Sequence, residues 1–434
     1  MRYYLEVSGC QMNKLDAEIL DGILKERGWI PAKSPKDADT ALFFACSVRK
    51  HAEDKVFSHI GALKHIKKKR GILIGLLGCT AQLQKKSLFE KLPLLDLLAG
   101  PGALSSVPDA LESLRNGAEK PLLFLEKRSS SYDSFRRCHT VTGISAFVRI
   151  VAGCSRVCSY CVVPHARGRA IERPPNEVLS EVEALARNGV KEIIFIGQDV
   201  AAYRYNDYDL ARLLKDALKI KGPVRFGFVT SHPASVNRNL FEVIASDERI
   251  SRFLHLPAQS GSDRILMMMR RNYTAKQYRE IVELARKIVP ELEVASDFIV
   301  GFPTETEKDF EETRCLIEDC EFINSFIFKY SERPMTIAAR RYKDDVPKPE
   351  KQHRNVLLLK TQERVSLLRK QRLLGRTLKV LVEGQDKKYK ERLIGRTWNN
   401  HIVVFDGESK AGDTVSVTIN SVTPLAAFGS VANG

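Results

Sequence analysis

Three cysteines in one short loop constrain the fold of this chain more than any other feature. Residues 151–161 have the sequence Val-Ala-Gly-Cys-Ser-Arg-Val-Cys-Ser-Tyr-Cys, so Cys154, Cys158 and Cys161 stand at CxxxCxxC spacing. The loop directly follows an apolar, strand-like run over residues 144–151. Such spacing gathers three thiolates around one small, soft metal centre.

The chemical character of that centre follows from the number of ligands. A closed structural zinc site takes four protein ligands, and no fourth Cys or His lies at usable spacing in this loop. Three cysteines on a cubic iron–sulfur cluster leave one iron without a protein ligand, and catalysis needs such an open position. The alternatives are a zinc loop completed by a distant residue and three buried small side chains. The spacing favours the cluster.

The same loop carries a family resemblance. CxxxCxxC with an aromatic residue, Tyr160, before the last cysteine resembles the signature of radical S-adenosylmethionine (SAM) enzymes. The resemblance implies that Cys154, Cys158 and Cys161 hold a 4Fe–4S cluster whose open iron binds SAM, with Tyr160 beside the SAM. It also implies that one electron splits SAM into methionine and a 5′-deoxyadenosyl radical.

Length and charge restrict the class of protein. The chain has 434 residues, enough for about three domains. Its formal net charge of +16 favours a polyanionic partner, most simply nucleic acid, because neutralised phosphates release counterions. A solvated basic surface is the alternative.

The number of cysteines and the hydropathy pattern indicate the cellular compartment. No apolar run is long enough to span a bilayer, and residues 1–6 begin a strand-like pattern rather than a signal segment. Nine cysteines without such a segment indicate a reducing compartment, where thiols ligate metals rather than pair. We therefore expect a cytoplasmic protein with no membrane partner.

Residues 1–118 alternate between strand-like and helix-like patterns, which predicts a doubly wound α/β domain with a parallel sheet. Cys10, Cys46 and Cys79 each lie just past one predicted strand. Loops at the carboxyl ends of parallel strands converge, so the three thiolates could hold a second cluster. Three buried small residues remain the alternative. The predicted elements are strands 2–7, 40–45 and 72–77, and helices 14–27, capped by Asn13, and 48–70.

The residues around these cysteines resemble the N-terminal domain of methylthiotransferases. They are Gly-Cys-Gln-Met-Asn at 9–13, Cys-Ser-Val-Arg at 46–49 and Gly-Cys-Thr-Ala-Gln at 78–82. The resemblance implies that Cys10, Cys46 and Cys79 hold an auxiliary 4Fe–4S cluster. Phe44-Ala45 departs from the Asn-Thr usual in that family, which removes polar groups near the expected cluster.

Residues 119–140 form a polar stretch that we interpret as a linker. Residues 141–372 then resume the alternation with strand candidates separated by amphipathic helical stretches. Six such units resemble the partial (β/α)6 barrel of radical SAM enzymes, and in a parallel barrel the chemistry gathers on loops after the strands. The predicted strands are 144–151, 192–196, 224–229, 252–256, 292–300 and 323–329.

Those loops supply the remaining candidates for cofactor binding. By resemblance, Gly197 and Gln198 support the methionine amino group of SAM, and Gly301 lies in the motif beside the adenine. Ordinary turn chemistry is the alternative for each. His232 and His255 are expected to orient loops or contact phosphate, because radical hydrogen abstraction needs no general base. No catalytic residue beyond the cluster ligands is expected.

Residues 373–434 change to short strands with glycine-rich turns, which predicts a small antiparallel β-barrel. A basic cluster surrounds its first hairpin, and small barrels with basic loops commonly bind nucleic-acid strands. The segment resembles the TRAM domain, an RNA-binding appendage of the same family; a solubilising cap is the alternative. The candidate RNA-binding residues are Lys387, Lys388, Lys390, Arg392 and Arg396.

The order of the three segments resembles methylthiotransferases over the whole chain, closest to the branch acting on tRNA. That branch implies methylthiolation of carbon 2 of N6-isopentenyladenosine beside the anticodon, with SAM as methyl donor and radical source. It also implies two 4Fe–4S clusters, the anticodon stem-loop as partner, and an electron donor such as flavodoxin or ferredoxin. We also expect a monomer.

Alternatives remain for the substrate. Sister enzymes methylthiolate threonylcarbamoyladenosine in tRNA or an aspartate in a small-subunit ribosomal protein. A non-enzymatic alternative is an RNA-binding protein with structural metal. Asp199, where the branch usually has Asn, and Met335, where it usually has Gly, are departures from the pattern.

Overall fold

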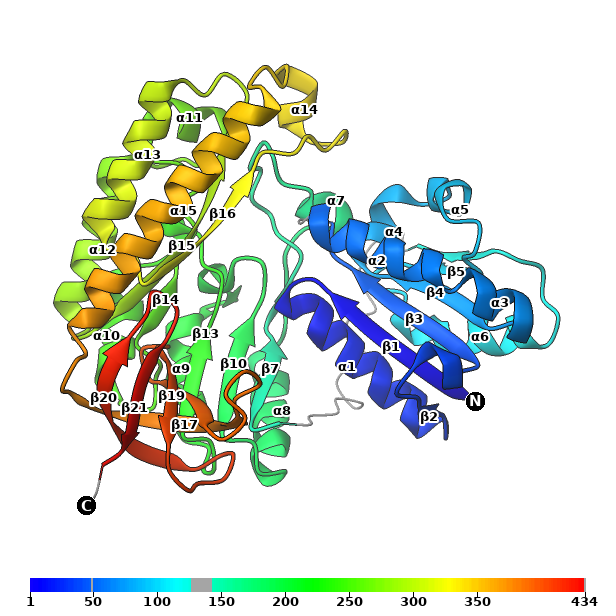
Figure 1. Ribbon diagram of the computed structural model, residues 1–434, viewed down its shortest axis with the longest axis horizontal. Helices are drawn as coiled ribbons and strands as arrows, with labels where there is room; N and C mark the ends of the chain where they lie inside the picture. The colour runs from blue at the N-terminus through cyan, green and yellow to red at the C-terminus, as the bar shows by residue number, and fades with distance from the viewer. Residues whose placement is uncertain (48–49, 126–142, 433–434) are drawn as a thin grey trace. The chain divides into compact units, whose positions relative to one another are not determined.

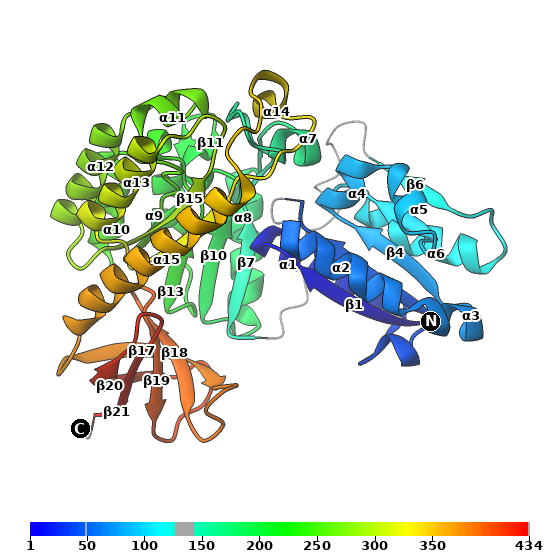
Figure 2. The same cartoon turned by 45° about the horizontal axis from the view of Figure 1, so that its top comes forward.

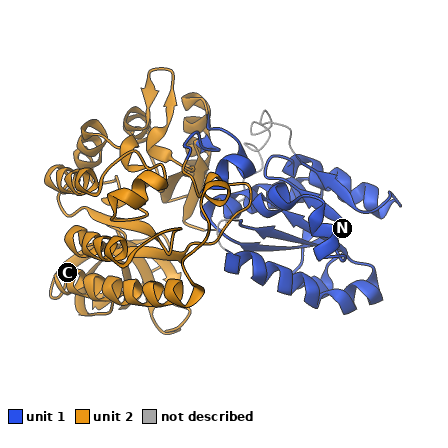
Figure 3. Cartoon of the chain, turned by 90° about the horizontal axis from the view of Figure 1, so that it is seen from above, with its two compact units in different colours: residues 1–142, 151–157, 161–171 blue, residues 143–150, 158–160, 172–434 orange. Residues whose placement is uncertain are grey.

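The computed structural model describes residues 1–47, 50–125 and 143–432. The chain divides into two compact units (Figure 3). The N-terminal unit contains residues 1–142, 151–157 and 161–171, and the C-terminal unit contains residues 143–150, 158–160 and 172–434. The chain therefore passes from one unit to the other inside the cysteine loop itself. The predicted boundaries at 118, 140 and 372 remain predictions.

The described strands of the N-terminal unit form one parallel sheet in the order β2-β1-β3-β4-β5-β6. The chain starts inside the sheet, adds β2 on one side and the later strands on the other, which confirms the doubly wound fold. β6 falls in the stretch predicted as a linker, much of which, with Cys138, lies outside the described residues. The strands are β1 (Arg2–Ser8), β2 (Ile30–Pro31), β3 (Thr40–Ala45), β4 (Leu73–Leu77), β5 (Leu97–Ala99) and β6 (Leu122–Phe124).

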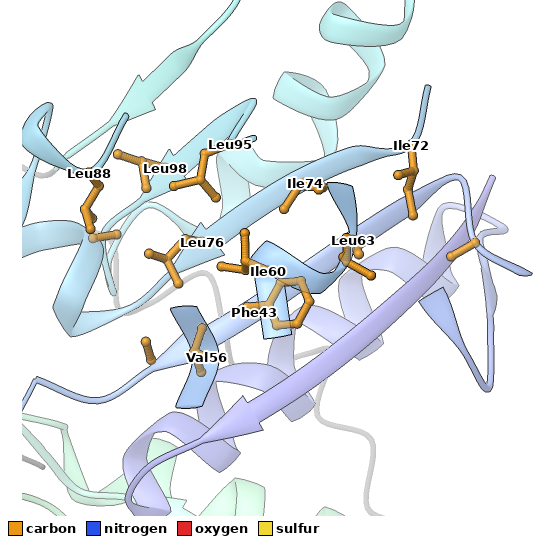
Figure 4. Packing of buried hydrophobic residues seen from close by; sticks show 14 residues of the cluster. Phe43, Val56, Ile60, Leu63, Ile72, Ile74, Leu76, Leu88, Leu95 and Leu98 are labelled. Carbon is orange, nitrogen blue, oxygen red and sulfur yellow. The ribbon is translucent and has the colours of Figure 1, made fainter. Parts of the chain in front are cut away.

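Every residue of β3 and β4 is buried, which requires helices on both faces of the sheet. On one face, Phe43, Ile74 and Leu76 pack against Val56 and Ile60 of α2 (Lys50–Ala62), as Figure 4 shows. Helices α1 (Gln11–Glu26) and α6 (Val107–Arg115) contact other residues of the sheet. Because strand side chains alternate, this continuous apolar pattern supplies both faces.

Two helix predictions in this unit were wrong in their limits. Helix α1 begins at Gln11 with Cys10 as its N-cap, and the predicted cap Asn13 is fully buried inside the helix. The helix predicted over 48–70 is divided into α2 and α3 (Lys64–Arg70), and its first two residues lie outside the described ones. The break falls at Leu63, whose side chain joins the core cluster, and most of the basic residues of α3 are exposed.

The C-terminal unit contains the predicted partial barrel (Figure 1). Strands β7 (Ser145–Arg149), β10 (Glu192–Ile196) and β13 (Arg225–Phe228) pair in parallel, as do β14 (Phe253–His255), β15 (Glu293–Val300) and β16 (Asn324–Lys329). A parallel bridge from Phe226 to Ile250 links the two sets. The helices after the strands are α8 (Pro175–Arg187), α9 (Leu210–Ala217), α10 (Arg238–Ser246), α12 (Ala275–Ile288) and α13 (Glu307–Cys320), followed by α15 (Lys348–Gln371).

The last segment closes into a small barrel in the order β17-β18-β19-β21-β20 (Figure 2). β21 was not predicted, because Gly429 and Ser430 weaken its strand pattern. Gly429 is required there, since a Cβ would collide with the Thr418 carbonyl of the neighbouring strand. The strands are β17 (Thr377–Gln385), β18 (Leu393–Thr397), β19 (Ile402–Asp406), β20 (Thr414–Val422) and β21 (Ala427–Val431).

Buried arginine contacts fasten this small barrel to the amino ends of the partial-barrel strands. The Arg225 Nε donates to Glu192 Oε1 at 2.6 Å, and its Nη1 donates to the carbonyls of Arg396 and Thr397 at 3.1 and 2.9 Å. The guanidinium also lies 5.6 Å from the Trp398 ring centroid. The small barrel is thus part of the C-terminal unit. No helix in the described parts of the chain is both long and apolar enough to cross a bilayer.

Candidate metal centres and RNA-binding surfaces

The first cysteine trio gathers at one edge of the N-terminal sheet. Cys10 follows β1, Cys46 follows β3 and Cys79 begins the helix after β4. β1 and β3 are neighbours at the point where the strand order reverses, which is where open α/β sheets bind ligands. Cys10 and Cys46 share a side-chain hydrogen bond, and Cys79 interacts electrostatically with Cys10. The structure therefore brings these three predicted site residues together.

A glycine before two of these cysteines allows this close approach. Gly9 has φ +155°, and a Cβ there would lie 2.6 Å from the Cys46 Cβ and 2.9 Å from the Asn13 Nδ2. Gly78, before Cys79, has φ +91°, a conformation that residues with a Cβ rarely adopt. Any larger residue at position 9 would separate the β1 and β3 loops.

The surroundings of the trio favour thiolate at one position and oppose it at another. The pKa of Cys10 is lowered to about 5, chiefly by the hydrogen bond with Cys46, with further contributions from Arg167 and the backbone N–H groups of Asn13 and Met12. Burial raises the pKa of Cys79, and the charge of Arg167 opposes that rise. Thiolate is the metal-binding form of cysteine.

Arg167, which was not predicted as a site residue, contacts the trio. Its Nε donates to Cys79 Sγ at 3.2 Å, and its Nη2 donates to Asn13 Oδ1 at 3.1 Å and Asp16 Oδ2 at 2.6 Å. The residue is only 4% exposed. No sequence signal pairs it with Cys79, which lies 88 residues earlier.

Buried polar atoms test whether the first trio suits a cluster. Asn13 Nδ2 and Ser47 Oγ, each next to the trio in sequence or space, are buried and have no hydrogen-bond partner among the described residues. Within those residues, no three Cys, His, Asp or Glu side chains are placed to hold a single metal ion. Unused donors beside three gathered thiols fit a larger group with acceptor sulfides.

The second trio is divided between the units. Cys154 and Cys161 belong to the N-terminal unit and Cys158 to the C-terminal unit. The Cys154 N–H donates to the Gly168 carbonyl at 3.1 Å, and the Val163 N–H lies 3.5 Å from Cys161 Sγ.

Gly153 allows the loop to lie against residues 167–169. Its φ is +75°, and a Cβ would lie 2.7 and 2.8 Å from the carbonyl oxygens of Gly168 and Arg167, and closer still to that of Arg169. The start of the cysteine loop thus packs backbone to backbone against the stretch that also carries the Arg167 side chain.

In the C-terminal unit, a second buried arginine contacts the second trio. Arg271 Nη1 lies 3.5 Å from Cys158 Sγ, and its Nη2 donates to the Pro257 carbonyl at 2.6 Å. Ser159 is held by its N–H to the Met269 carbonyl at 3.0 Å. The partly buried Tyr160 packs against a cluster that contains Ile265, Met269, Phe302, Tyr330 and Ala338.

Apart from Tyr160, the predicted SAM residues of this unit follow β10 and β15. Gln198 Oε1 is buried without a partner among the described residues, and so are Ser231 Oγ after β13 and Tyr330 Oη after β16. Unused polar atoms at several strand ends fit a polar ligand such as SAM. Gly197 is buried, whereas Gly301, at φ +68°, makes room for Lys351 and donates its N–H to Glu305 Oε1 at 2.8 Å. Ser231 and Tyr330 were not predicted as site residues.

Each of the two histidines is hydrogen-bonded to an aspartate, His232 after β13 and His255 at the end of β14. Asp199 accepts from the backbone N–H of His232 at 2.9 Å and from Ser235 Oγ at 2.8 Å. The carboxylate that stands where the family branch usually has Asn therefore joins two loops. His255 Nε2 lies 3.1 Å from Asp297 Oδ1.

Aromatic side chains line the same face of the sheet as Asp297. Phe326 pairs with Asp297 in register, is 44% exposed and stacks on Phe328 with centroids 6.4 Å apart. Phe298 points to the opposite face, where it meets Phe322. The face of β15 and β16 turned away from Phe298 therefore combines exposed aromatic area with a His–Asp pair.

The predicted basic residues of the small barrel separate into two groups. Lys387, Lys388 and Lys390 are exposed in the loop between β17 and β18. Arg392 and Arg396 are instead ion-paired, with Asp406 at 3.0 Å and Glu383 at 2.9 Å. Tyr389 lies among the lysines and is 38% exposed. Its ring centroid is 5.0 Å from Lys388 Nζ. It was missed as a candidate.

Comparison with protein families finds three that match successive parts of the chain. Residues 2–100 match the uncharacterized protein family UPF0004, residues 148–317 match the radical SAM superfamily, and residues 371–432 match the TRAM domain. Among solved structures, the radical SAM methyltransferase TsrM from Kitasatospora setae superposes with a TM-score of 0.57 at 13% identity, covering 78% of this chain and 75% of TsrM. The cobalamin-dependent SAM radical enzyme OxsB gives 0.52 at 13% identity, over 84% and 56% of the two chains.

Curated relatives extend over the full chain. The tRNA-2-methylthio-N(6)-dimethylallyladenosine synthase of Thermotoga petrophila is 39% identical over 99% of this chain and 97% of its own. Enzymes of the same name from Rhodopirellula baltica and Myxococcus xanthus are 39% and 40% identical, over 99% and 98% of this chain and 95% and 92% of their own. The chain therefore belongs to the tRNA-2-methylthio-N(6)-dimethylallyladenosine synthase family of radical SAM enzymes.

Proposed function

We infer that this enzyme adds a methylthio group to carbon 2 of N6-isopentenyladenosine beside the tRNA anticodon. The observation that carries the inference is the pair of cysteine trios in a chain that aligns with 97% of its Thermotoga petrophila relative. The carbon 2 hydrogen of adenine is unactivated, so polar chemistry removes it poorly and a radical route is needed.

In this proposal each trio has one task. Cys154, Cys158 and Cys161 would hold the SAM-binding 4Fe–4S cluster, and Cys10, Cys46 and Cys79 the auxiliary one. When bound, the first cluster supplies the electron that cleaves SAM, and the second supplies the sulfur that SAM methylates. Gln198, Ser231 and Tyr330 would provide polar contacts for SAM, since their buried polar atoms have no partner in the described parts of the chain.

The face of β15 and β16 described above would receive the modified base. An enzyme acting on a base in RNA takes it out of the stack and holds it between aromatic or apolar side chains. Phe326 and Phe328 offer that surface for the prenylated adenine, and the His255–Asp297 pair offers a polar edge.

RNA outside the modified base would contact the loop of residues 386–392. Exposed lysines neutralise phosphates, and Tyr389 offers a ring on which a base can stack. The pairing of Arg392 and Arg396 with carboxylates makes the lysines the main cations of this surface. A flavodoxin or ferredoxin electron donor, a monomeric state and a cytoplasmic location are further expectations of the proposal.

Mass spectrometry of tRNA nucleosides tests this function. A strain lacking the gene should lose 2-methylthio-N6-isopentenyladenosine and accumulate N6-isopentenyladenosine, and the wild-type gene should restore it. Loss of methylthio-threonylcarbamoyladenosine, or of the methylthio-aspartate of a ribosomal protein, would instead assign the enzyme to a sister activity.

The surface for the base is tested separately with RNA binding. Phe326→Ala should weaken binding of a prenylated anticodon stem-loop by about 1–3 kcal/mol through lost stacking, and should weaken binding of the unprenylated RNA by less, because that RNA lacks the prenyl contact. Equal losses for both RNAs would contradict a role for Phe326 in holding the prenylated base. Phe241→Ala, which removes a buried phenyl ring of α10, is a control for loss of packing alone.

A further inference from the structure

Arg167 contacts one cysteine of the first trio by its side chain, and its own stretch of backbone contacts one cysteine of the second. The side chain donates to Cys79 Sγ at 3.2 Å. One residue later, the Gly168 carbonyl accepts from the Cys154 N–H at 3.1 Å. Residues 167–169 therefore lie against Cys79 and Cys154 within the N-terminal unit.

The guanidinium is held rigidly in this position. Asp16 Oδ2, in a side chain with no exposed area, accepts from its Nη2 at 2.6 Å, and Asn13 Oδ1 accepts from the same nitrogen at 3.1 Å. Helix α1 carries both acceptors and starts at Cys10. The pair Arg167–Asp16 thus places a buried positive and a buried negative charge beside the first trio.

We propose that Arg167 is a positioning residue of the auxiliary centre that fixes Cys79 and raises the reduction potential of a cluster held there. The inference rests on the proposed auxiliary cluster. An N–H donor to a ligand sulfur and a nearby positive charge both stabilise the form with one more electron. The carboxylate of Asp16 opposes that effect, because a buried negative charge disfavours reduction.

This assignment makes predictions of opposite sign for two members of one ion pair. Arg167→Gln removes the positive charge and leaves Asp16 buried, so the midpoint potential should become more negative. Asp16→Asn removes the opposing charge, so the potential should become less negative. A residue that only supported the fold would shift both variants in the same direction or neither.

The experiment is a redox titration of the whole chain, in which electron paramagnetic resonance detects the reduced cluster at each potential. It is carried out in a Cys154→Ala, Cys158→Ala, Cys161→Ala background, so that only the auxiliary cluster contributes. Arg225→Gln is the matched control, because it breaks another buried arginine–carboxylate pair of 2.6 Å in the other unit and should leave the potential unchanged.

The outcomes distinguish failure of the proposed auxiliary cluster from failure of the proposed role of Arg167. Failure of the background protein to bind iron and sulfide would remove the proposed auxiliary cluster itself. If that cluster forms but its potential is the same with and without Arg167 and Asp16, the role of Arg167 is wrong and the proposed function stands. If Arg167→Gln binds no cluster, two other variants decide. Asp16→Asn must raise the potential and Arg167→Lys, which keeps the charge, must retain the cluster; an unchanged potential in Asp16→Asn contradicts the role of Arg167.

Discussion

Replacing Gly153 by alanine is expected to damage the cysteine loop at its start. The new Cβ would lie 2.7 and 2.8 Å from two backbone carbonyl oxygens, and backbone cannot move aside as a flexible side chain can. The positive φ of +75° costs about 1–2 kcal/mol for any residue with a Cβ. Overpacking of a tight contact adds about 1–3 kcal/mol, so the total destabilisation should be about 2–5 kcal/mol.

Gly71→Ala separates the two costs. Gly71, at the end of α3, has φ 66° and ψ 22°, and nothing lies within 4 Å of a Cβ there. Both glycines belong to the N-terminal unit. The free energy of unfolding of the control should therefore fall only by the conformational cost, about 1–2 kcal/mol.

Fluorescence of Trp29 measures these differences. Trp29 is buried in the N-terminal unit, and Trp398→Phe removes the other tryptophan of the chain. Guanidinium unfolding in that background should show Gly153→Ala to be less stable than Gly71→Ala, and only the former should lose iron. Equal stability and equal iron content in the two variants would refute the packing described for residues 153 and 167–169.

Three further predictions test other parts of the structure. In metal-free protein, iodoacetamide should alkylate Cys10 with a midpoint near pH 5, because its folded pKa is lowered to about 5 and thiolate dominates above it; Cys315, whose pKa is raised by burial, should react only at alkaline pH in the same sample. Arg225→Gln should cost about 3–5 kcal/mol, because it leaves Glu192 buried without its arginine, and should speed proteolysis near residues 372–376. Tyr389→Ala should weaken tRNA binding by about 1–3 kcal/mol, whereas Tyr205→Ala, an exposed tyrosine of the partial barrel, should not.

The sequence predicted the architecture well where periodicity was strong. Continuous apolar runs such as residues 40–45 marked strands buried on both faces, and all the strands proposed for the partial barrel are present within one or two residues at most ends. The failures are local. The start of α1 was missed because the extended Gly9–Cys10 segment places a cysteine, which is not a usual cap, at its N-terminus.

The site was less predictable than the fold. Cysteine spacing and position after strands identified Cys10, Cys46 and Cys79, which the structure brings together. Arg167 and Arg271 could not be found this way, because their contacts with cysteines join residues 88 and 113 positions apart. Charge alone also placed Arg392 and Arg396 with the lysines, although neighbouring carboxylates occupy them.

Anaerobic iron and sulfide analysis of three proteins tests the central claim most directly. Two cubic clusters predict about eight iron atoms in the wild-type chain, and about four in each variant that lacks one trio, Cys10/Cys46/Cys79→Ala or Cys154/Cys158/Cys161→Ala. Iron that disappears entirely from both variants, or zinc in place of iron, would contradict two separate clusters held by the two trios.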